Sequence, residues 1–183
     1  MEEYERVVYD LDGTLVRLDV DWDAVHAAVV ERVREHGVEV GDRTLWDVLD
    51  VAEEHGVSDV VEDTIAEFER DGARTSRRLP LADELPLDVP VAICSLNCEA
   101  ACRIALETHS LDGHVGSVVG RDTVAGHKPD PEPLLHAIDS VGEDPERALF
   151  VGDSESDREA AERAGVAFEW VADRTARLAA DEE

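Results

Sequence analysis

The sequence predicts a doubly wound α/β fold, in which a parallel sheet carries helices on both faces, together with a small inserted helical segment. Two observations lead to this class. Short runs rich in Val, Ala and Leu recur along the chain and end at Asp, Ser or Gly, as buried parallel strands do. Amphipathic helical patterns separate most of these runs, and strands that alternate with helices build a parallel sheet. With 183 residues, the chain is long enough for one such core and a small insertion.

Five runs are predicted to be the strands of this sheet. They lie at residues 7–9, 91–94, 117–119, 148–151 and 167–171. The first run stops at Asp10 and is followed by the turn-forming residues Asp12 and Gly13. Because ligands of such sheets bind beyond the carboxyl ends of the strands, the ends of these runs indicate where a functional site is expected.

Helices are predicted between the later strands. Their amphipathic patterns cover residues 99–108, 131–141 and 156–164. The second of them is expected to start with Asp130 as the N-cap and Pro131 at the first helical position.

Residues 16–86 interrupt the alternation of strands and helices. Three apolar stripes with helical spacing occur there, and the segment shows no convincing strand pattern. We therefore expect a core made of residues 1–15 and 87–183 and a helical cap over residues 16–86. The cap is inserted where it can close over the strand ends. The alternative is a helical elaboration that only pads the core.

The composition is strongly acidic. Acidic residues number 45 and Lys plus Arg 17, so the formal net charge is −28, which disfavours nucleic acid and anionic membranes as partners. The 43% of apolar residues can still build a packed core. Sixteen of the basic residues are Arg and only Lys128 is Lys. This acidic, lysine-poor composition resembles that of proteins from salt-in halophiles and suggests a halophilic archaeal source.

Several features predict a cytoplasmic protein. The N-terminus is acidic and only a short apolar run follows it, so no signal peptide is expected. No apolar stretch approaches membrane-spanning length. Cys94, Cys98 and Cys102 lack paired Cys-x-x-Cys spacing, so we expect them to be reduced packing residues.

Two carboxylates stand at the end of the first predicted strand. Asp10 can attack a phosphorus atom, while Asp12, two residues further on, handles the proton of the leaving group. Asp19, Asp21 and Asp23 repeat the Asp-x-Asp pattern, but they follow no apolar strand. We expect these three on a solvated face.

Lys128 is the most informative single residue. A chain that otherwise uses only Arg keeps its one Lys in the loop after the third predicted strand. A compact ammonium can contact both a phosphate oxygen and the carboxylate of a nucleophile, whereas a broad planar guanidinium fits such a crowded site poorly. Lys128 and Ser95, which follows the second strand, are expected at the same sheet edge as Asp10.

Further acidic residues follow the fourth predicted strand. Asp153 and Asp157 bring negative charge toward Asp10, which is costly unless a cation or a buried proton compensates it. Hard oxygen ligands of this kind suit Mg²⁺, which binds through a few carboxylates and a substrate phosphate. The alternative for Asp157 is a charge at a helix N-terminus that only interacts with the helix dipole.

Taken in chain order, these residues resemble the four sequence motifs of the haloacid dehalogenase superfamily. The motifs correspond to Asp10-Leu11-Asp12-Gly13-Thr14-Leu15, Ser95, Lys128, and Gly152-Asp153 with Asp157. The resemblance spans residues 7–171, and the inserted helices resemble the cap of the phosphoglycolate phosphatase type. It implies a Rossmann-like core and a phosphatase that acts on a small phosphorylated metabolite.

The resemblance also implies catalytic roles. Asp10 would attack phosphorus and form an aspartyl-phosphate, and Asp12 would act as general acid and then as general base. Ser95 and Lys128 would hold the phosphoryl oxygens. Dehalogenation is disfavoured, because true dehalogenases differ at the position of Asp12.

The cofactor implied by the resemblance is Mg²⁺. Asp10, the main-chain carbonyl of Asp12 and Asp153 would bind it, and Asp157 would be a ligand or lie next to one.

The sequence departs from the family pattern in several places. Leu96 stands where Asn usually follows the motif's Ser or Thr, which leaves the role of Asn97 open. Residues 16–18 lack the acidic residue that often follows the first motif. Three arginines near the end of the cap either meet a substrate carboxylate or second phosphate, or make surface ion pairs. They are Arg74, Arg77 and Arg78.

The core motifs leave two other functions open. A phosphosugar mutase of the same superfamily uses the same two Asp roles but returns the phosphoryl group to a sugar, under a cap that excludes water. A non-catalytic protein that binds a phosphate ligand is the second alternative, and the filled catalytic positions argue against it. The motifs determine neither the oligomeric state nor the substrate. Phosphoglycolate is a candidate substrate by family analogy.

Overall fold

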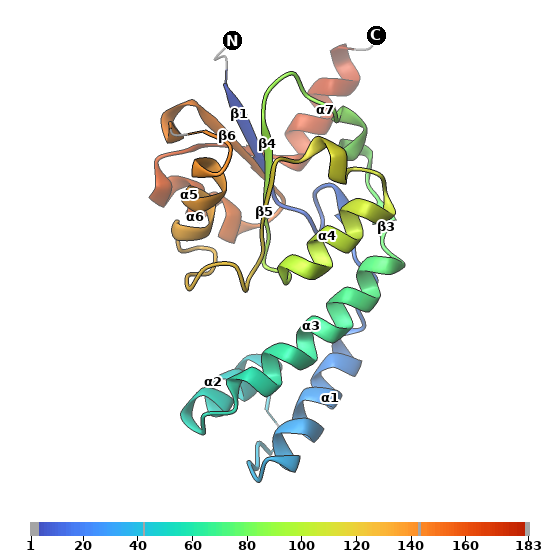
Figure 1. Cartoon of the computed structure of the whole chain (residues 1–183), viewed down its shortest axis with the longest axis vertical. Helices are drawn as coiled ribbons and strands as arrows, with labels where there is room; N and C mark the ends of the chain where they lie inside the picture. Colours follow the sequence, from blue (N-terminus) through green and yellow to red (C-terminus); the bar gives the residue numbers. More distant parts are fainter. Residues whose placement is uncertain (1–3, 42, 143, 182–183) are drawn as a thin grey trace.

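The apolar runs form a five-stranded parallel sheet in the computed structural model, which describes residues 4–41, 43–142 and 144–181. The strands are β1 (Arg6–Tyr9), β4 (Val91–Cys94), β5 (Ser117–Val119), β6 (Ala148–Gly152) and β7 (Ala167–Trp170). Their order is β5-β4-β1-β6-β7, so the chain adds strands on both sides of β1 (Figure 1). The three central strands are buried along their whole length, as expected for a sheet covered on both faces. The predicted doubly wound α/β class is confirmed.

Helices connect the strands and cover the sheet. They are α4 (Glu99–Thr108), α5 (Glu132–Asp139), α6 (Glu155–Ala164) and α7 (Val171–Asp181), with short 3₁₀ turns η1 (Pro80–Glu84), η2 (Asp112–His114) and η3 (Pro145–Arg147). The predicted start of α5 was wrong by one residue. Pro131 occupies the N-cap, although the Asp130 side chain still accepts from the N–H of Glu132 at 2.8 Å, as a capping side chain does. Val171, predicted as strand, instead begins α7.

Alternate residues of the strands pack into two separate hydrophobic clusters. Val7 and Tyr9 of β1 face the cluster that includes α4, whereas Val8 faces the cluster that includes α5 and α6. Helix α7 lies on the same face as α4, and α5 and α6 lie together on the other (Figure 1). The three cysteines are buried and free, as expected for packing residues. No helix in the described part of the chain is long and apolar enough to cross a membrane.

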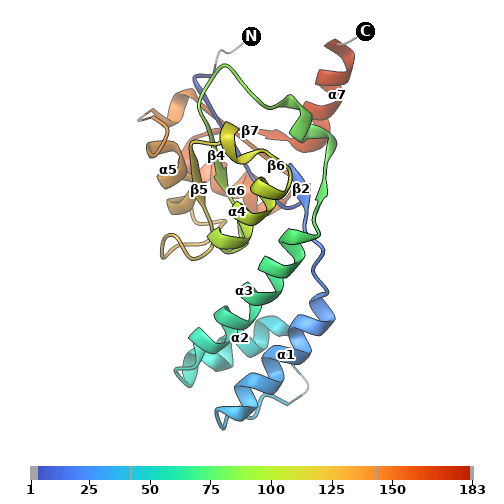
Figure 2. The same cartoon turned by 45° about the vertical axis from the view of Figure 1, so that its right-hand side comes forward.

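The segment between β1 and β4 contains a bundle of three helices, α1 (Trp22–Glu35), α2 (Leu45–Glu54) and α3 (Ser58–Arg74). We call residues 16–86 the helical insert. Its helices extend away from the core on the side where the sheet strands end (Figures 1 and 2). Val25, Val29 and Val33 of α1 meet α3 residues in a separate hydrophobic cluster, so the apolar stripes predicted from the sequence do face one another.

The two ends of the helical insert pair with each other next to the core. Strands β2 (Val16–Arg17) and β3 (Arg77–Arg78) form an antiparallel ribbon, with Val16 opposite Arg78 and Arg17 opposite Arg77. The sequence analysis expected no strand in this segment. Two residues are too few for an alternating pattern to be recognised, so only the pairing reveals them.

Candidate active site

Asp10 lies at the centre of the sheet edge where the strands end. It directly follows β1, is 6% exposed, and its N–H donates to the carbonyl of Val151 in the neighbouring strand β6. One carboxylate oxygen, Oδ1, accepts from Lys128 Nζ at 2.9 Å, and the other accepts from Thr14 Oγ1 at 3.3 Å. The carboxylate is therefore held in one orientation by donors on both oxygens.

Lys128 brings three parts of the site together. Its Nζ lies 2.9 Å from Asp10 Oδ1, 2.5 Å from Asp157 Oδ1 and 3.0 Å from the carbonyl oxygen of Cys94. The side chain is buried, and the ammonium lies 5.5 Å from the centroid of the Phe150 ring. Since an ammonium has three N–H bonds, these three acceptors use all of them. Burial lowers the pKa of Lys128, but the carboxylates of Asp10 and Asp157 together outweigh it and raise the pKa, so Lys128 is charged.

Three carboxylates form a cluster that fits a divalent cation. Asp10, Asp153 and Asp157 each offer one oxygen, and these oxygens lie within 4.8 Å of one another. Asp157 is held in place because its Oδ2 accepts from the N–H and the hydroxyl of Ser154, at 3.0 and 2.6 Å. Lys128 supplies one positive charge against three carboxylates, and hard oxygen donors are the ligands that Mg²⁺ prefers. The donor set therefore fits the predicted cofactor.

Gly13 makes room for this cluster. Its φ of +93° is one that glycine adopts without strain, and a Cβ at this position would lie only 2.0 Å from Asp153 Oδ2. Any other residue here would push Asp153 away from the cluster.

The pKa values of the carboxyl groups reflect burial and mutual repulsion. Burial and the charge of Asp157 together raise the pKa of Asp10 to about 7, although Lys128 opposes the shift. Burial and the charge of Asp157 likewise raise the pKa of Asp153. A bound divalent cation would favour the ionised form of each group.

Asp12 follows Asp10 by two residues, but its carboxylate is not one of the three that form the cluster. Its Oδ1 accepts from the N–H of Leu18 at 3.0 Å. Burial raises the pKa of Asp12, against the opposing effects of the Leu18 N–H and the charge of Arg17. A half-buried carboxyl group with a raised pKa is suited to giving and taking a proton.

Ser95 occupies the end of β4 and is buried. Its hydroxyl donates to Asn97 Oδ1 at 3.2 Å and accepts from the Asn97 N–H at 3.2 Å. Ser95 adjoins Cys94, whose carbonyl binds Lys128, so the two residues predicted to hold phosphate lie on neighbouring parts of the same edge.

The sequence analysis missed Glu69 and Arg121. Glu69 of α3 is 1% exposed, and its carboxylate contacts the segment after Ser95 and the guanidinium of Arg121. A signal for Glu69 was present, because it follows Ile65 by four residues on the apolar face of α3. No comparable local signal marks Arg121.

The structure leaves the other candidate residues outside the cluster. Arg74 forms an ion pair with Asp71, and Arg78 with Asp83 at 2.9 Å. Two of the three arginines at the end of the insert thus make the ion pairs considered in the sequence analysis. Asp19, Asp21 and Asp23 are exposed, and Asp21 caps α1.

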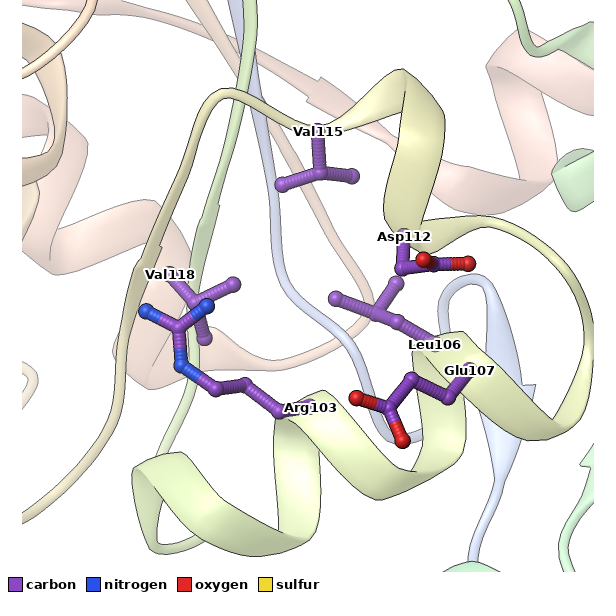
Figure 3. Close-up of a pocket in the computed structure, with 6 residues that line it drawn as sticks. All are labelled: Arg103, Leu106, Glu107, Asp112, Val115 and Val118. Atoms are coloured by element: carbon purple, nitrogen blue, oxygen red, sulfur yellow. The ribbon is translucent and has the colours of Figure 1, made fainter.

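Two hollows occur in the described part of the core. The first, about 60 Å³, lies between α4, η2 and β5 and is lined by apolar and charged side chains (Figure 3). It contains none of the candidate residues and is far smaller than pockets that hold metabolites. The second, about 450 Å³, opens beside Asp153 and is bounded by residues 170–173.

Comparisons with known proteins identify the class. Residues 83–171 match the family model of haloacid dehalogenase-like hydrolases. A phosphoglycolate phosphatase of Cereibacter sphaeroides is 30% identical over 184 aligned positions, covering 88% of this chain and 82% of the relative. The solved structure of a haloacid dehalogenase superfamily hydrolase from Geobacter sulfurreducens is 27% identical, with 90% of this chain and 88% of that chain covered and a TM-score of 0.61. The chain therefore belongs to the haloacid dehalogenase-like hydrolases.

Within that family, the similarity in sequence is to phosphoglycolate phosphatases. The enzyme of Aquifex aeolicus is 40% identical over 75 residues, which are 41% of this chain. The matched segment spans only about a third, 35%, of that relative's length.

Proposed function

We propose that the protein is a Mg²⁺-dependent phosphatase that hydrolyses a small phosphomonoester through an aspartyl-phosphate on Asp10. The observation that carries this proposal is the position of Asp10. It is buried at the centre of the strand-end cluster, it is oriented by Lys128 and Thr14, and two further carboxylates lie beside it. Membership of a hydrolase family adds independent support.

In the first step, a carboxylate oxygen of Asp10 forms a bond to phosphorus while the bond from phosphorus to the leaving oxygen breaks. Asp12 gives its proton to that leaving oxygen. In the second step, Asp12 takes a proton from water, the water oxygen bonds to phosphorus, and the bond to Asp10 breaks. Inorganic phosphate leaves and Asp10 is restored.

Lys128 and Ser95 would hold the phosphoryl oxygens during both steps. All three N–H bonds of Lys128 are used by protein acceptors, so a phosphoryl oxygen would share or replace one of these contacts. Asp10, Asp153 and the main-chain carbonyl of Asp12 would hold Mg²⁺, and Asp157 would complete the cluster while keeping Lys128 in place. Bound Mg²⁺ would neutralise the carboxylates and the charge on the transferred group.

The helical insert, residues 16–86, is proposed as a cap that covers the site and limits the size of the substrate. Phosphoglycolate is the substrate proposed first, because the relatives from Aquifex aeolicus and Cereibacter sphaeroides are named phosphoglycolate phosphatases. The position of Arg17 supports a substrate that carries an acidic group in addition to its phosphate. Its guanidinium would lie 3.2 Å from a Cβ at Gly13, and its charge acts on both Asp12 and Asp153. A panel that compares phosphoglycolate with ethyl phosphate would test this, since only the first carries a carboxylate.

A cytoplasmic location and a halophilic archaeal source complete the proposal. The net charge of −28 and the single lysine support the halophilic source. At low ionic strength, the like charges on an acidic surface repel one another. Unfolding temperatures that rise steeply with KCl would support a halophilic protein, and a temperature independent of KCl would contradict it.

The decisive experiment measures phosphate release from an aryl phosphate in high KCl, with Mg²⁺ and with EDTA. Asp10→Asn should lower turnover by at least about 10³-fold, because the amide cannot act as the nucleophile. Asp23→Asn is the matched control, since it makes the same change at an exposed position of α1. A folded wild-type protein that releases no phosphate would overturn the proposal. A requirement for a sugar bisphosphate, with little phosphate released, would favour the mutase.

A further inference from the structure

The carboxylate of Glu69 connects the helical insert to the core. It projects from α3, and both of its oxygens are occupied by core donors. Oε1 accepts from Asn97 Nδ2 at 3.3 Å and from Arg121 Nη1 at 2.7 Å. Oε2 accepts from the N–H of Cys98 at 3.0 Å and from Arg121 Nη2 at 3.1 Å. A buried carboxylate with four donors is a well-defined anchor rather than a loose surface contact.

Arg121 holds the same core segment from the other side. Its Nη1 also donates to the carbonyl of Leu96 at 2.7 Å, and its backbone N–H donates to the carbonyl of Asn97 at 2.9 Å. Its Nε donates to Glu62 of α3 at 2.9 Å. Residues 96–98 are therefore fixed jointly by α3 and by the loop after β5.

The contact between Glu69 and Asn97 decides which end of the Asn97 amide faces Ser95. Because the carboxylate of Glu69 accepts only, it must be the NH₂ group of Asn97 that points toward it. The oxygen of the amide then points toward the Ser95 hydroxyl, which donates to it, and the Asn97 N–H binds the same hydroxyl oxygen. A side chain of the helical insert thus sets, through one residue, the orientation of the Ser95 hydroxyl, and a phosphoryl oxygen held by Ser95 would share or replace the contact of its one hydrogen with Asn97 Oδ1.

We propose that Glu69 is a positioning residue for Ser95, acting through Asn97, so that docking of α3 on the core and phosphate binding at Ser95 are coupled. This inference rests on the proposed function only in taking Ser95 as a phosphate-holding residue. It assigns a role to Asn97, which lies one position later than the family pattern expects.

The test measures the affinity of the whole protein for inorganic phosphate, by calorimetry in high KCl with Mg²⁺. Glu69→Gln is the main variant. Both carboxylate oxygens face donors, so the NH₂ group of a glutamine must meet a donor wherever it points. Phosphate affinity should fall about tenfold, the size expected when a contact that orients a ligand group is lost. Glu69→Asp keeps the charge but draws the carboxylate back from Asn97, and should show a loss of the same order.

Glu62→Gln is the matched control. It makes the same chemical change on the same helix and removes a contact with Arg121, but Glu62 contacts neither Asn97 nor Cys98 in the described structure. Its phosphate affinity should stay within about twofold of wild type, as expected for a half-exposed pair.

A double-mutant cycle with Asn97→Ala distinguishes an effect of Glu69 that passes through Asn97 from a general loss of protein stability. If Glu69 acts through Asn97, Glu69→Gln should cause no further loss of phosphate affinity in the Asn97→Ala protein. Additive losses, or a folded Glu69→Gln protein that binds phosphate like wild type, would overturn the inference. Wild type that binds no phosphate would overturn both proposals. Wild type that binds phosphate without turnover would overturn the proposed function alone.

Discussion

Two buried clusters of charge lie on the side of the core that faces the helical insert, and they are built differently. Around Lys128, the two buried carboxylates of Asp10 and Asp157 share one ammonium, and the exposed carboxylate of Asp153 lies beside them. Around Arg121, one fully buried carboxylate, that of Glu69, meets one guanidinium, and each oxygen has two donors. Among the buried groups, the first cluster therefore carries excess negative charge and the second is balanced, while the half-exposed Glu62 also pairs with Arg121.

The difference indicates what each cluster can do. Excess buried charge is costly and is tolerated where a cation or a proton completes the site, which is the situation expected for metal-assisted chemistry. A balanced cluster has no need of a ligand, but it holds its neighbours in one geometry. Burial that raises the pKa of Asp10 to about 7 marks the first cluster. The pKa of Arg121, by contrast, is raised by Glu69 and Glu62, so the second cluster is stably charged.

The largest effect on stability is expected from Lys128→Met. The change leaves Asp10 and Asp157 buried without their only ammonium partner. The free energy of unfolding should fall by about 3–5 kcal/mol, the usual cost of breaking a buried pair. Urea unfolding in EDTA would measure it. A loss below about 1 kcal/mol would show that the carboxyl groups are already protonated or hydrated, and the contrast between the clusters would be lost.

Mg²⁺ should stabilise the protein through the unbalanced cluster only. At a concentration one hundred times its Kd, a cation that binds only the folded state adds about 2.7 kcal/mol to the free energy of unfolding. Asp153→Asn should remove most of this gain. Asp173→Asn is the control. Asp173 borders the same hollow of about 450 Å³ as Asp153, but it lies outside the carboxylate cluster. Equal stabilisation of both variants would mean that Mg²⁺ binds elsewhere.

Arg121→Met should have a smaller effect than Lys128→Met. Glu69 loses its guanidinium but keeps donors from Asn97 and Cys98, and the Arg121 side chain is 15% exposed. A loss of about 2 kcal/mol in the free energy of unfolding is expected. Adding Mg²⁺ should not restore the lost free energy of unfolding. Recovery with Mg²⁺ would show that the two clusters are not independent.

The smallest effect is expected at a surface cluster of charges. Arg158 contacts Glu155 and Glu162 along α6, and all three side chains are well exposed. Arg158→Gln should leave the midpoint of urea unfolding unchanged within error, because exposed ion pairs are solvated and screened. A clear shift would show that electrostatics of the acidic surface matter as much as the buried clusters.

The sequence by itself predicted the five strands of the parallel sheet, three of the core helices to within two residues at each end, and the candidate positions at the strand ends. This was possible because burial imposes a local period on a strand or helix, and because the ends of parallel strands share one sheet edge. Residues 91–94 and 99–108, for example, were predicted with the limits observed for β4 and α4. The catalytic and metal-binding roles of the strand-end residues stay predictions.

Only the tertiary structure decided which charged groups meet. The sequence analysis placed Lys128 beside Asp10, but it predicted neither the contact of Lys128 with Asp157, 29 positions away, nor that of Arg121 with Glu69, 52 positions away. Such pairings depend on how loops and the helical insert dock, and a chain with 45 acidic residues offers many partners for every arginine. A hydrophobic pattern repeats within one element and can be read locally. A contact between two charged side chains exists only once both elements are packed, so no local pattern records it.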